Sequence, residues 1–331
     1  MSRDALIAGF LARHGYATAG QEPLAQDASF RRYLRLIGGP RPAILMDAPP
    51  PEDIRPFLRI ADHLAGTGVS VPEILAADAG TGLLLEEDLG DDLFASLLAD
   101  ERESCRLFDA AIDALVAMQR APAPRGLPAW DAATMARTAM ATLFDWWWPA
   151  VFGTLPPDAA VQDFAAALER MLAPVAAGPV GFVHRDFFVG NLIWLPQRDG
   201  TRRVGVLDFQ TAAIGHPAYD LASLLQDARR DIPRPVAERA IARYLALRPE
   251  LDAAGIRAAY AACAAQRHLR VAGQWVRLAQ RDRRPGYLVH GPRTWRLLEE
   301  ATQEPVAAPL AAALDRWIPP GRRGNPPDIA T

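Results

Sequence analysis

Lysine is absent from this chain of 331 residues, in which all 36 basic side chains are arginine. Chemistry that needs a lysine amine, such as Schiff-base formation, is therefore excluded. Any side chain that binds a phosphate through positive charge must be an arginine, or backbone N–H groups must do the binding. An arginine-, alanine- and proline-rich composition accounts for the absence, but the chemical consequence is the same.

Cysteine and long apolar runs are also scarce. Cys105 and Cys263 lie far apart, so we expect neither a disulfide framework nor a cysteine metal site, as in a reducing cytoplasm. The first residues include Asp4 and lack a long apolar core, so we expect no signal peptide, and no run of about 18 apolar residues predicts a membrane span. The net charge of −3 predicts neither a nucleic-acid nor a membrane partner.

The front of the chain carries strand patterns, and the rest is mostly helical. Strands are expected in FRRYLRLIG, PAILMDA and GLLLEEDLG, and helices at 2–15 and in PFLRIADHLAGTG. Alanine- and leucine-rich segments predict helices at 93–120, 132–148 and 158–177, and again from 218 to 317. These patterns predict an α+β fold with a small β-rich N-terminal lobe and a larger, mostly helical C-terminal lobe.

A polar cluster interrupts the helices in the segment GFVHRDFFVGNLIWL. His184, Arg185 and Asp186 are followed by Asn191, and a predicted hairpin then leads to Asp208. The pattern H-R-D-x-x-x-x-N, followed by a strand that ends in Asp-Phe, indicates phosphoryl transfer of the protein-kinase type. Asp186 would accept the proton of the attacking hydroxyl, and Asn191 and Asp208 would hold Mg²⁺ through oxygen atoms. His184 and Arg185 are expected to support the loop.

The residues after this motif argue against a protein substrate. Asp220 follows Asp208 closely, no A-P-E sequence closes a long activation segment, and no G-x-G-x-x-G motif occurs near the N-terminus. A small-molecule acceptor is therefore expected. Asp220 itself is expected to cap a helix or to brace the loop.

The chain resembles the aminoglycoside phosphotransferase family, and within it the bacterial kinases that phosphorylate the anomeric hydroxyl of N-acetylmuramate and N-acetylglucosamine. The resemblance spans residues 20–300 and rests on the motifs above together with SFRRY, MDAPP and EEDLGDDLF. It implies a protein-kinase-like bilobal fold, ATP and Mg²⁺ as cofactors, an amino-sugar substrate and a role in peptidoglycan recycling. We expect a cytoplasmic monomer.

The resemblance also implies a division of the chain. We expect a nucleotide-binding lobe at 1–85, a hinge at 86–91, a helical lobe with the catalytic loop and acceptor pocket at 92–317, and a flexible tail at 318–331. Within the hinge, Glu87 and Leu89 are expected to contact adenine through their backbone groups.

Met46 stands where the third strand of a kinase carries its phosphate-binding lysine. We expect Arg31 or Arg32 of SFRRY to take over this role. The two point to opposite faces of a strand. Arg32 shares the less polar face with Phe30 and Leu34, which favours Arg32 as the residue in the cleft. The alternative is that both arginines are surface charges.

Five arginines at helical spacing form one stripe: Arg267, Arg270, Arg277, Arg281 and Arg284. Either the stripe faces solvent, or its first members, Arg267 and Arg270, line the acceptor pocket and bind an anionic group such as the lactyl carboxylate of N-acetylmuramate. Trp147, in a run of three tryptophans, is expected to stack on a sugar or to pack helices together. Gln210 and Asp227 are further pocket candidates.

Three functional hypotheses remain open from the residues. The first is an active amino-sugar kinase, which the complete set of Asp186, Asn191 and Asp208 favours. The second is a kinase for another small alcohol, such as an aminoglycoside, choline, homoserine or methylthioribose. The third is a nucleotide-binding pseudokinase that regulates a partner, which the missing lysine favours.

Overall fold

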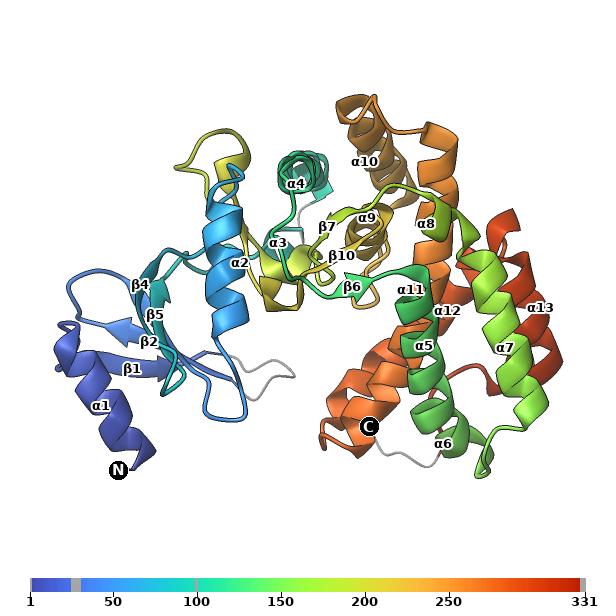
Figure 1. Ribbon diagram of the computed structural model, residues 1–331, viewed down its shortest axis with the longest axis horizontal. Coiled ribbons are helices and arrows are strands. Elements are labelled where there is room, and N and C mark those ends of the chain that lie inside the picture. Colours follow the sequence, from blue (N-terminus) through green and yellow to red (C-terminus); the bar gives the residue numbers. More distant parts are fainter. Residues whose placement is uncertain (1, 25–30, 99–100, 328–331) are drawn as a thin grey trace. The chain divides into compact units, whose positions relative to one another are not determined.

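The computed structural model describes residues 2–24, 31–98 and 101–327, so that Phe30 and the end of the expected tail lie outside the described residues. It divides the chain into two compact units. The first comprises Met1–Glu103 and Gly190–Gln210, and the second Ser104–Val189 and Thr211–Thr331. The larger sheet lies in the first unit and most of the helices lie in the second, which confirms the expected α+β class (Figure 1).

The first unit is built on a five-stranded antiparallel sheet in the order β1-β2-β3-β5-β4. Its strands are β1 (Gly20–Pro23), β2 (Arg32–Ile37), β3 (Ala43–Asp47), β4 (Ile74–Asp78) and β5 (Leu83–Glu87). Figure 1 shows α1 (Arg3–Arg13) on one side of this sheet and α2 (Arg55–Ala65) on the other. Each of the expected strands and helices of this region is therefore present.

The two helices form where their sequences favour it. The side chain of Ser2 accepts a hydrogen bond from the Ala5 N–H and caps α1. The α1 side chains Ile7, Phe10 and Leu11 are buried against the sheet. In α2 the buried residues Phe57, Ile60, Ala61 and Leu64 recur at the three- and four-residue spacing of one helical face, and the helix ends at Gly66.

Strand alternation separates the two faces of the sheet. Leu36, Leu45 and Leu85 pack in the same core as α1. Neighbouring residues on a strand point in opposite directions, so that Tyr33 and Glu86 belong to the face away from α1. This alternation decides which of the polar side chains of β2 and β5 meet one another.

A hairpin from the middle of the chain completes the first unit. Its strands β8 (Leu192–Trp194) and β9 (Val204–Val206) pair antiparallel. The Ser70 N–H donates to the Val204 carbonyl, and the Val206 N–H donates to the Ser70 carbonyl, so the hairpin is bonded to the segment between α2 and β4. The short α3 (Phe94–Leu97) also lies in this unit. These bonds explain why residues 190–210 group with the N-terminal residues, although the sequence predicted them within the C-terminal lobe.

The second unit is helical. After α4 (Glu101–Arg120), which begins at the end of the first unit, its helices are α5 (Ala132–Thr142), α6 (Trp148–Phe152), α7 (Asp158–Met171), α8 (Ala173–Ala177), α9 (Ala218–Leu225), α10 (Arg234–Leu247), α11 (Ala253–Gln280), α12 (Gly291–Ala301) and α13 (Ala308–Trp317). Helix α11, capped by the Asp252 side chain, is buried along most of its length among α5, α9 and α12. Within the described part of the chain, no helix combines the length and the apolar run needed to cross a membrane.

Gly273 explains how closely α11 packs. A Cβ atom at this position would lie 2.2 Å from the Thr142 carbonyl oxygen at the end of α5. The absence of a side chain therefore lets the two helices approach each other at backbone distance.

A small sheet positions the polar loop within the second unit. Its strands are β6 (Ala129–Trp130), β7 (Gly181–Val183) and β10 (Ala213–Gly215), in the order β6-β10-β7. Because β7 ends at Val183, the chain enters the loop at His184 directly from a buried strand.

The run of three tryptophans is part of the core, not of a sugar site. The expected helix 132–148 is interrupted by a π-helical turn, Leu143–Trp147, so that the adjacent Trp147 and Trp148 are both buried and Trp146 is partly exposed. Trp147 is fully buried, packs on Trp295 at 4.7 Å between ring centroids, and donates its indole N–H to the Gly324 carbonyl at 2.8 Å. The structure thus removes Trp147 from the substrate-binding candidates.

The hydrogen bond between Trp147 and Gly324 also bears on the segment expected to be a flexible tail. Gly324 is held by Trp147, and the Asn325 amide donates to the Leu288 carbonyl at 2.7 Å. Residues 318–327 are therefore anchored on the helical unit, whereas 328–331 lie outside the described residues.

Candidate active site

The loop that follows β7 is braced by one buried carboxylate. Asp220, on α9, accepts the His184 N–H at 2.7 Å and the Arg185 N–H at 2.9 Å. Arg185 has a positive φ of 76°, a conformation that costs energy in a residue other than glycine. The imidazole of His184, fully buried against Phe187, accepts the Asp186 N–H through Nδ1 at 3.3 Å. The conformation of the loop around Asp186 is thus held by hydrogen bonds that backbone N–H groups donate to the side chains of Asp220 and His184.

Burial raises the pKa of Asp220 to about 7, although the two backbone N–H groups and Arg267 favour its ionised form. Asp220 lies inside α9 and not at its first residue, so its contacts are those of a loop brace rather than of a helix cap.

Thr211, which the sequence analysis missed, contacts the proposed base directly. Its hydroxyl donates to Asp186 Oδ2 at 3.3 Å, and its carbonyl accepts a hydrogen bond from the Arg185 guanidinium at 3.2 Å. That guanidinium lies 3.9 Å from the centroid of the Trp130 ring. The only signal in the sequence is the position of Thr211, three residues beyond Asp208 in DFQT.

Two arginines of α11, the buried Arg267 and the partly buried Arg270, lie near the same aspartate. Arg267, only 4% exposed, donates to the Ser223 hydroxyl at 2.9 Å, and Arg270 donates to the Tyr219 hydroxyl at 3.3 Å. The charge of Asp186 acts on both guanidinium groups. The interpretation of this stripe as a solvated face is therefore wrong for its first two members. It holds for Arg281, which is exposed and paired with its neighbour Asp282.

Asp227 belongs to a turn beside the loop. It is buried, and its carboxylate accepts the Arg229 N–H at 2.9 Å. The Arg229 guanidinium lies 4.5 Å from the ring centroid of Phe188, which belongs to the polar loop. The second unit thus brings Asp186, Asp227 and the two buried arginines into one neighbourhood.

The first unit brings together the two residues expected to hold a metal ion. The Leu207 N–H donates to the Asn191 carbonyl at 2.9 Å, which places Asn191 next to Asp208 at the open end of the β8–β9 hairpin. Asp208 has a positive φ of 59°, and Gln210 donates to its Oδ1 at 2.5 Å. An amide oxygen and a carboxylate are ligands that suit Mg²⁺, so the residues present fit that ion. Gln210 contacts Asp208, so its observed role is to orient this carboxylate.

Arg31 and Arg32 point to opposite faces of the sheet, as expected, and of the two it is Arg31 that is buried. Arg32, on the α1 face, binds the fully buried Asp47 together with Arg3, and its side chain is 53% exposed. Arg31 is only 7% exposed, and its Nε donates to Glu52 at 3.1 Å. The sequence favoured Arg32 for the phosphate contact, but its guanidinium is paired with Asp47, whereas the more polar face of β2 carries the buried polar cluster.

That cluster includes Tyr33 and Glu86 beside Arg31. Burial, and then the charge of Glu86, raises the pKa of Tyr33, whereas Arg31 lowers it through its charge and a hydrogen bond. The charge of Asp208 also acts on Tyr33, so the cluster lies near Asp208, one of the two residues expected to hold a metal ion. Burial raises the pKa of Glu86 to about 8, against the effect of Arg31. Burial thus favours the uncharged form of Glu86, and the ion pair of Arg31 is the one with Glu52.

The expected hinge residues have defined contacts. The Glu87 N–H donates to the Glu73 carbonyl at 2.8 Å, so this donor is used in the sheet and is not open to a base. Leu89 packs on Ile193 and Leu195 of the hairpin. Of the two, Leu89 keeps its place as a candidate for contact with adenine.

The raised pKa of Glu86 gives a testable dependence of stability on pH. Its folded-state pKa of about 8 exceeds the ordinary value of 4.5. The contribution of Glu86 to the free energy of unfolding is therefore fully present below pH 4.5. It is lost as the pH rises through 8, by no more than ~1.4 kcal/mol per pH unit. Glu86→Gln removes this dependence, so we expect the variant to gain stability relative to the natural protein between pH 5 and 9. Urea unfolding at pH 5, 7 and 9 measures the difference.

Glu86→Leu serves as the matched control. Like Glu86→Gln it removes the titrating carboxyl group, but it does not introduce an amide. It should show the same pH dependence as Glu86→Gln around a different absolute stability. Unfolding curves of the natural protein and of Glu86→Gln that stay parallel across this pH range would contradict the assignment.

Known proteins match the chain over most of its length. The model of the APH phosphotransferase enzyme family matches residues 20–254. The chain is 38% identical to the N-acetylmuramate/N-acetylglucosamine kinase of Caulobacter vibrioides, with 96% of this chain and 97% of the relative covered. It is also 38% identical to the kinase of the same name from Pseudomonas aeruginosa, over 88% of this chain and 87% of the relative.

Solved structures share the fold at low sequence identity. A choline/ethanolamine kinase family protein from Mesorhizobium loti superposes with a TM-score of 0.66 at 15% identity, covering 95% of this chain and 100% of that one. The APH(2″)-IIa enzyme in its ternary complex with streptomycin and ATP gives a TM-score of 0.60 at 14% identity, covering 83% and 91%. These likenesses confirm the kinase-like fold, and the family match confirms the resemblance drawn from the sequence motifs: the chain belongs to the APH phosphotransferase enzyme family.

Proposed function

We propose that this phosphotransferase, with Mg²⁺ as its cofactor, transfers the γ-phosphate of ATP to the anomeric C1 hydroxyl of N-acetylmuramate, N-acetylglucosamine or both. This reaction would be a step of peptidoglycan recycling. The observation that carries the proposal is the 38% identity, over 96% of the chain, to a kinase named for these two sugars. Membership of the family implies ATP as co-substrate and, in general, a divalent metal ion.

Asp186 is the proposed general base. The C1 hydroxyl oxygen attacks the γ-phosphorus, its proton passes to Asp186, and ADP leaves with the electrons of the broken P–O bond. An anomeric hydroxyl is more acidic than an ordinary alcohol, which makes this proton transfer easier. The brace of Asp220 and the hydrogen bond from Thr211 support the role, because they hold the carboxylate in one orientation.

We assign the binding of the nucleotide phosphates and the metal ion to Arg31, Asn191 and Asp208. Arg31 is a buried guanidinium in a lysine-free protein, and a bidentate guanidinium suits phosphate oxygens. Asn191 and Asp208 would hold the metal ion, which when bound supplies positive charge opposite the phosphate oxygens. Catalysis then consists mainly of positioning and charge stabilisation.

Arg267 and Arg270 are proposed to bind the sugar that accepts the phosphate, and Asp227 lies nearby. The buried Nε atoms of both arginines have no hydrogen-bond partner within the described residues. Buried polar groups are normally satisfied, so a ligand with an anionic or carbonyl oxygen would complete them. The lactyl carboxylate of N-acetylmuramate is such a group.

A substrate panel tests the proposed function. Purified protein is incubated with Mg·ATP and, separately, N-acetylmuramate, N-acetylglucosamine, aminoglycosides and amino alcohols, and ADP release is followed. We expect turnover with the amino sugars only, reduced by at least about 100-fold in Asp186→Asn. Turnover with an amino alcohol would overturn the sugar assignment and keep the mechanism. Nucleotide binding without turnover on any acceptor would instead favour a pseudokinase.

Paired arginine variants test the phosphate contact. Arg31→Ala should raise the Michaelis constant for ATP by roughly tenfold, the loss expected for one charged hydrogen-bonding contact. Arg32→Ala is the matched control from the opposite face of β2 and should leave this constant unchanged. The assignment fails if both variants change it equally, or if neither does.

Thr211 gives a test of how Asp186 is oriented. Thr211→Val keeps the shape but removes the hydroxyl donor, so we expect kcat to fall by roughly tenfold while the Michaelis constants change little. Thr211→Ser should restore most of the rate. If the valine variant kept its full kcat, the hydrogen bond seen at 3.3 Å would have no role in catalysis.

A further inference from the structure

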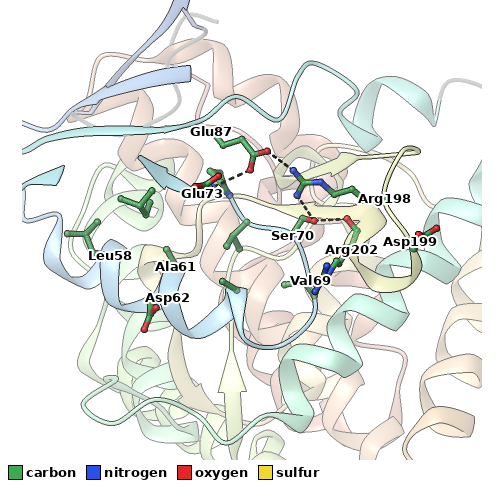
Figure 2. A pocket seen from close by; sticks show the side chains of 14 residues that line it. Leu58, Ala61, Asp62, Val69, Ser70, Glu73, Glu87, Arg198, Asp199 and Arg202 are labelled. Carbon is green, nitrogen blue, oxygen red and sulfur yellow. Dashed lines mark hydrogen bonds and ion pairs between the residues drawn. The ribbon is translucent and has the colours of Figure 1, made fainter. Parts of the chain in front are cut away.

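The closed end of the β8–β9 hairpin borders a cavity in the first unit. The cavity has a volume of about 810 Å³ and is lined on one side by apolar residues of α2 and the following segment, and on the other by Glu73, Glu87, Arg198 and Arg202. Figure 2 shows Arg198 extending from the hairpin turn toward Glu87 and Ser70.

Arg198 joins three segments of the chain in this cavity wall. Its guanidinium donates to Glu87 Oε1 at 2.6 Å and to the Ser70 hydroxyl at 2.7 Å. The Ser70 hydroxyl donates in turn to the Arg202 carbonyl at 2.6 Å, which closes the link back to the turn. The Arg198 and Glu87 side chains are only 28% and 19% exposed, so water competes little for this charged pair.

The same hairpin carries the metal-binding pair at its other end. Asn191 directly precedes β8, and Asp208 follows β9 by two residues. Only three residue pairs separate the two ends, from Leu192↔Val206 to Trp194↔Val204. Strands rise by about 3.3 Å per residue, so the paired part of the hairpin is only about 10 Å long and its two ends lie close together. A change in how its turn is held therefore changes where its open end lies.

We propose that Arg198 is a positioning residue for the metal-binding pair. By tying the hairpin turn to Glu87, the last residue of β5, it sets the place of Asn191 and Asp208 relative to the strand that leads into the expected adenine-binding segment. The proposal rests on the proposed function in one respect, that Asn191 and Asp208 hold the metal ion. It does not depend on which acceptor is phosphorylated.

A binding measurement without acceptor tests this inference. Mn²⁺, a paramagnetic substitute for Mg²⁺, is titrated into the full-length protein with saturating ADP, and free Mn²⁺ is followed by electron paramagnetic resonance. Arg198→Gln should weaken Mn²⁺ binding by at least roughly fivefold, the lower end of couplings between sites. The affinity for ADP without metal and the Michaelis constant for the amino sugar should not change.

Two further variants provide the controls. Arg202→Ala removes a side chain from the same turn that has no hydrogen bond or ion pair within the described residues, so Mn²⁺ binding should stay at its natural value. Glu87→Gln should reproduce the loss seen in Arg198→Gln, and the double variant should lose no more than either single variant.

The outcomes separate positioning from general stability. Unchanged Mn²⁺ affinity in Arg198→Gln overturns the proposal, and so does an equal loss of Mn²⁺, metal-free ADP and sugar affinity, which would indicate only a loosened fold. If the natural protein binds no Mn²⁺ with ADP, the metal assignment itself fails. A failed substrate panel combined with the expected Mn²⁺ results would overturn the sugar assignment alone.

Discussion

A single backbone hydrogen bond, from the Leu207 N–H to the Asn191 carbonyl, holds the two expected metal ligands side by side. It closes the open end of a hairpin only three residue pairs long, and the hairpin is bonded along its edge to Ser70. The left-handed conformation of Asp208 is kept in place by this surrounding ladder. The metal-binding half of the chemistry thus depends on local pairing within the first unit.

Buried charge organises both units in the same way. In the first unit, the buried Arg31 is paired with Glu52 and lies beside Tyr33 and Glu86, whose pKa is raised by burial. In the second, Arg267 and Arg270 keep buried Nε atoms without a partner within the described residues. A buried guanidinium is costly unless a counter-ion completes it. This cost is consistent with the proposal that each cluster contacts an anionic ligand.

The catalytic loop itself could be predicted from its spacing, because H-R-D-x-x-x-x-N and a later Asp-Phe specify a chemistry by residue type and order. Its support could not. The contacts of Asp220 with two backbone N–H groups, and of Thr211 with Asp186, join residues more than twenty positions apart, and no local pattern marks them. Trp147 failed as a candidate for the same reason, since a π-helical turn decides which tryptophan faces the core.

The sequence by itself determined the α+β class and three of the five strands of the larger sheet, and it predicted the base and the metal-binding pair, because periodicity and motif spacing are local properties of the chain. It also determined that no lysine can bind the phosphates, which leaves arginine or backbone N–H groups for this role. Only the tertiary structure decided that Arg31 is buried and Arg32 is not, because strand alternation places two neighbours on opposite faces without saying which face is buried. The burial of Arg267 and Arg270 was likewise decided by the elements that pack around α11.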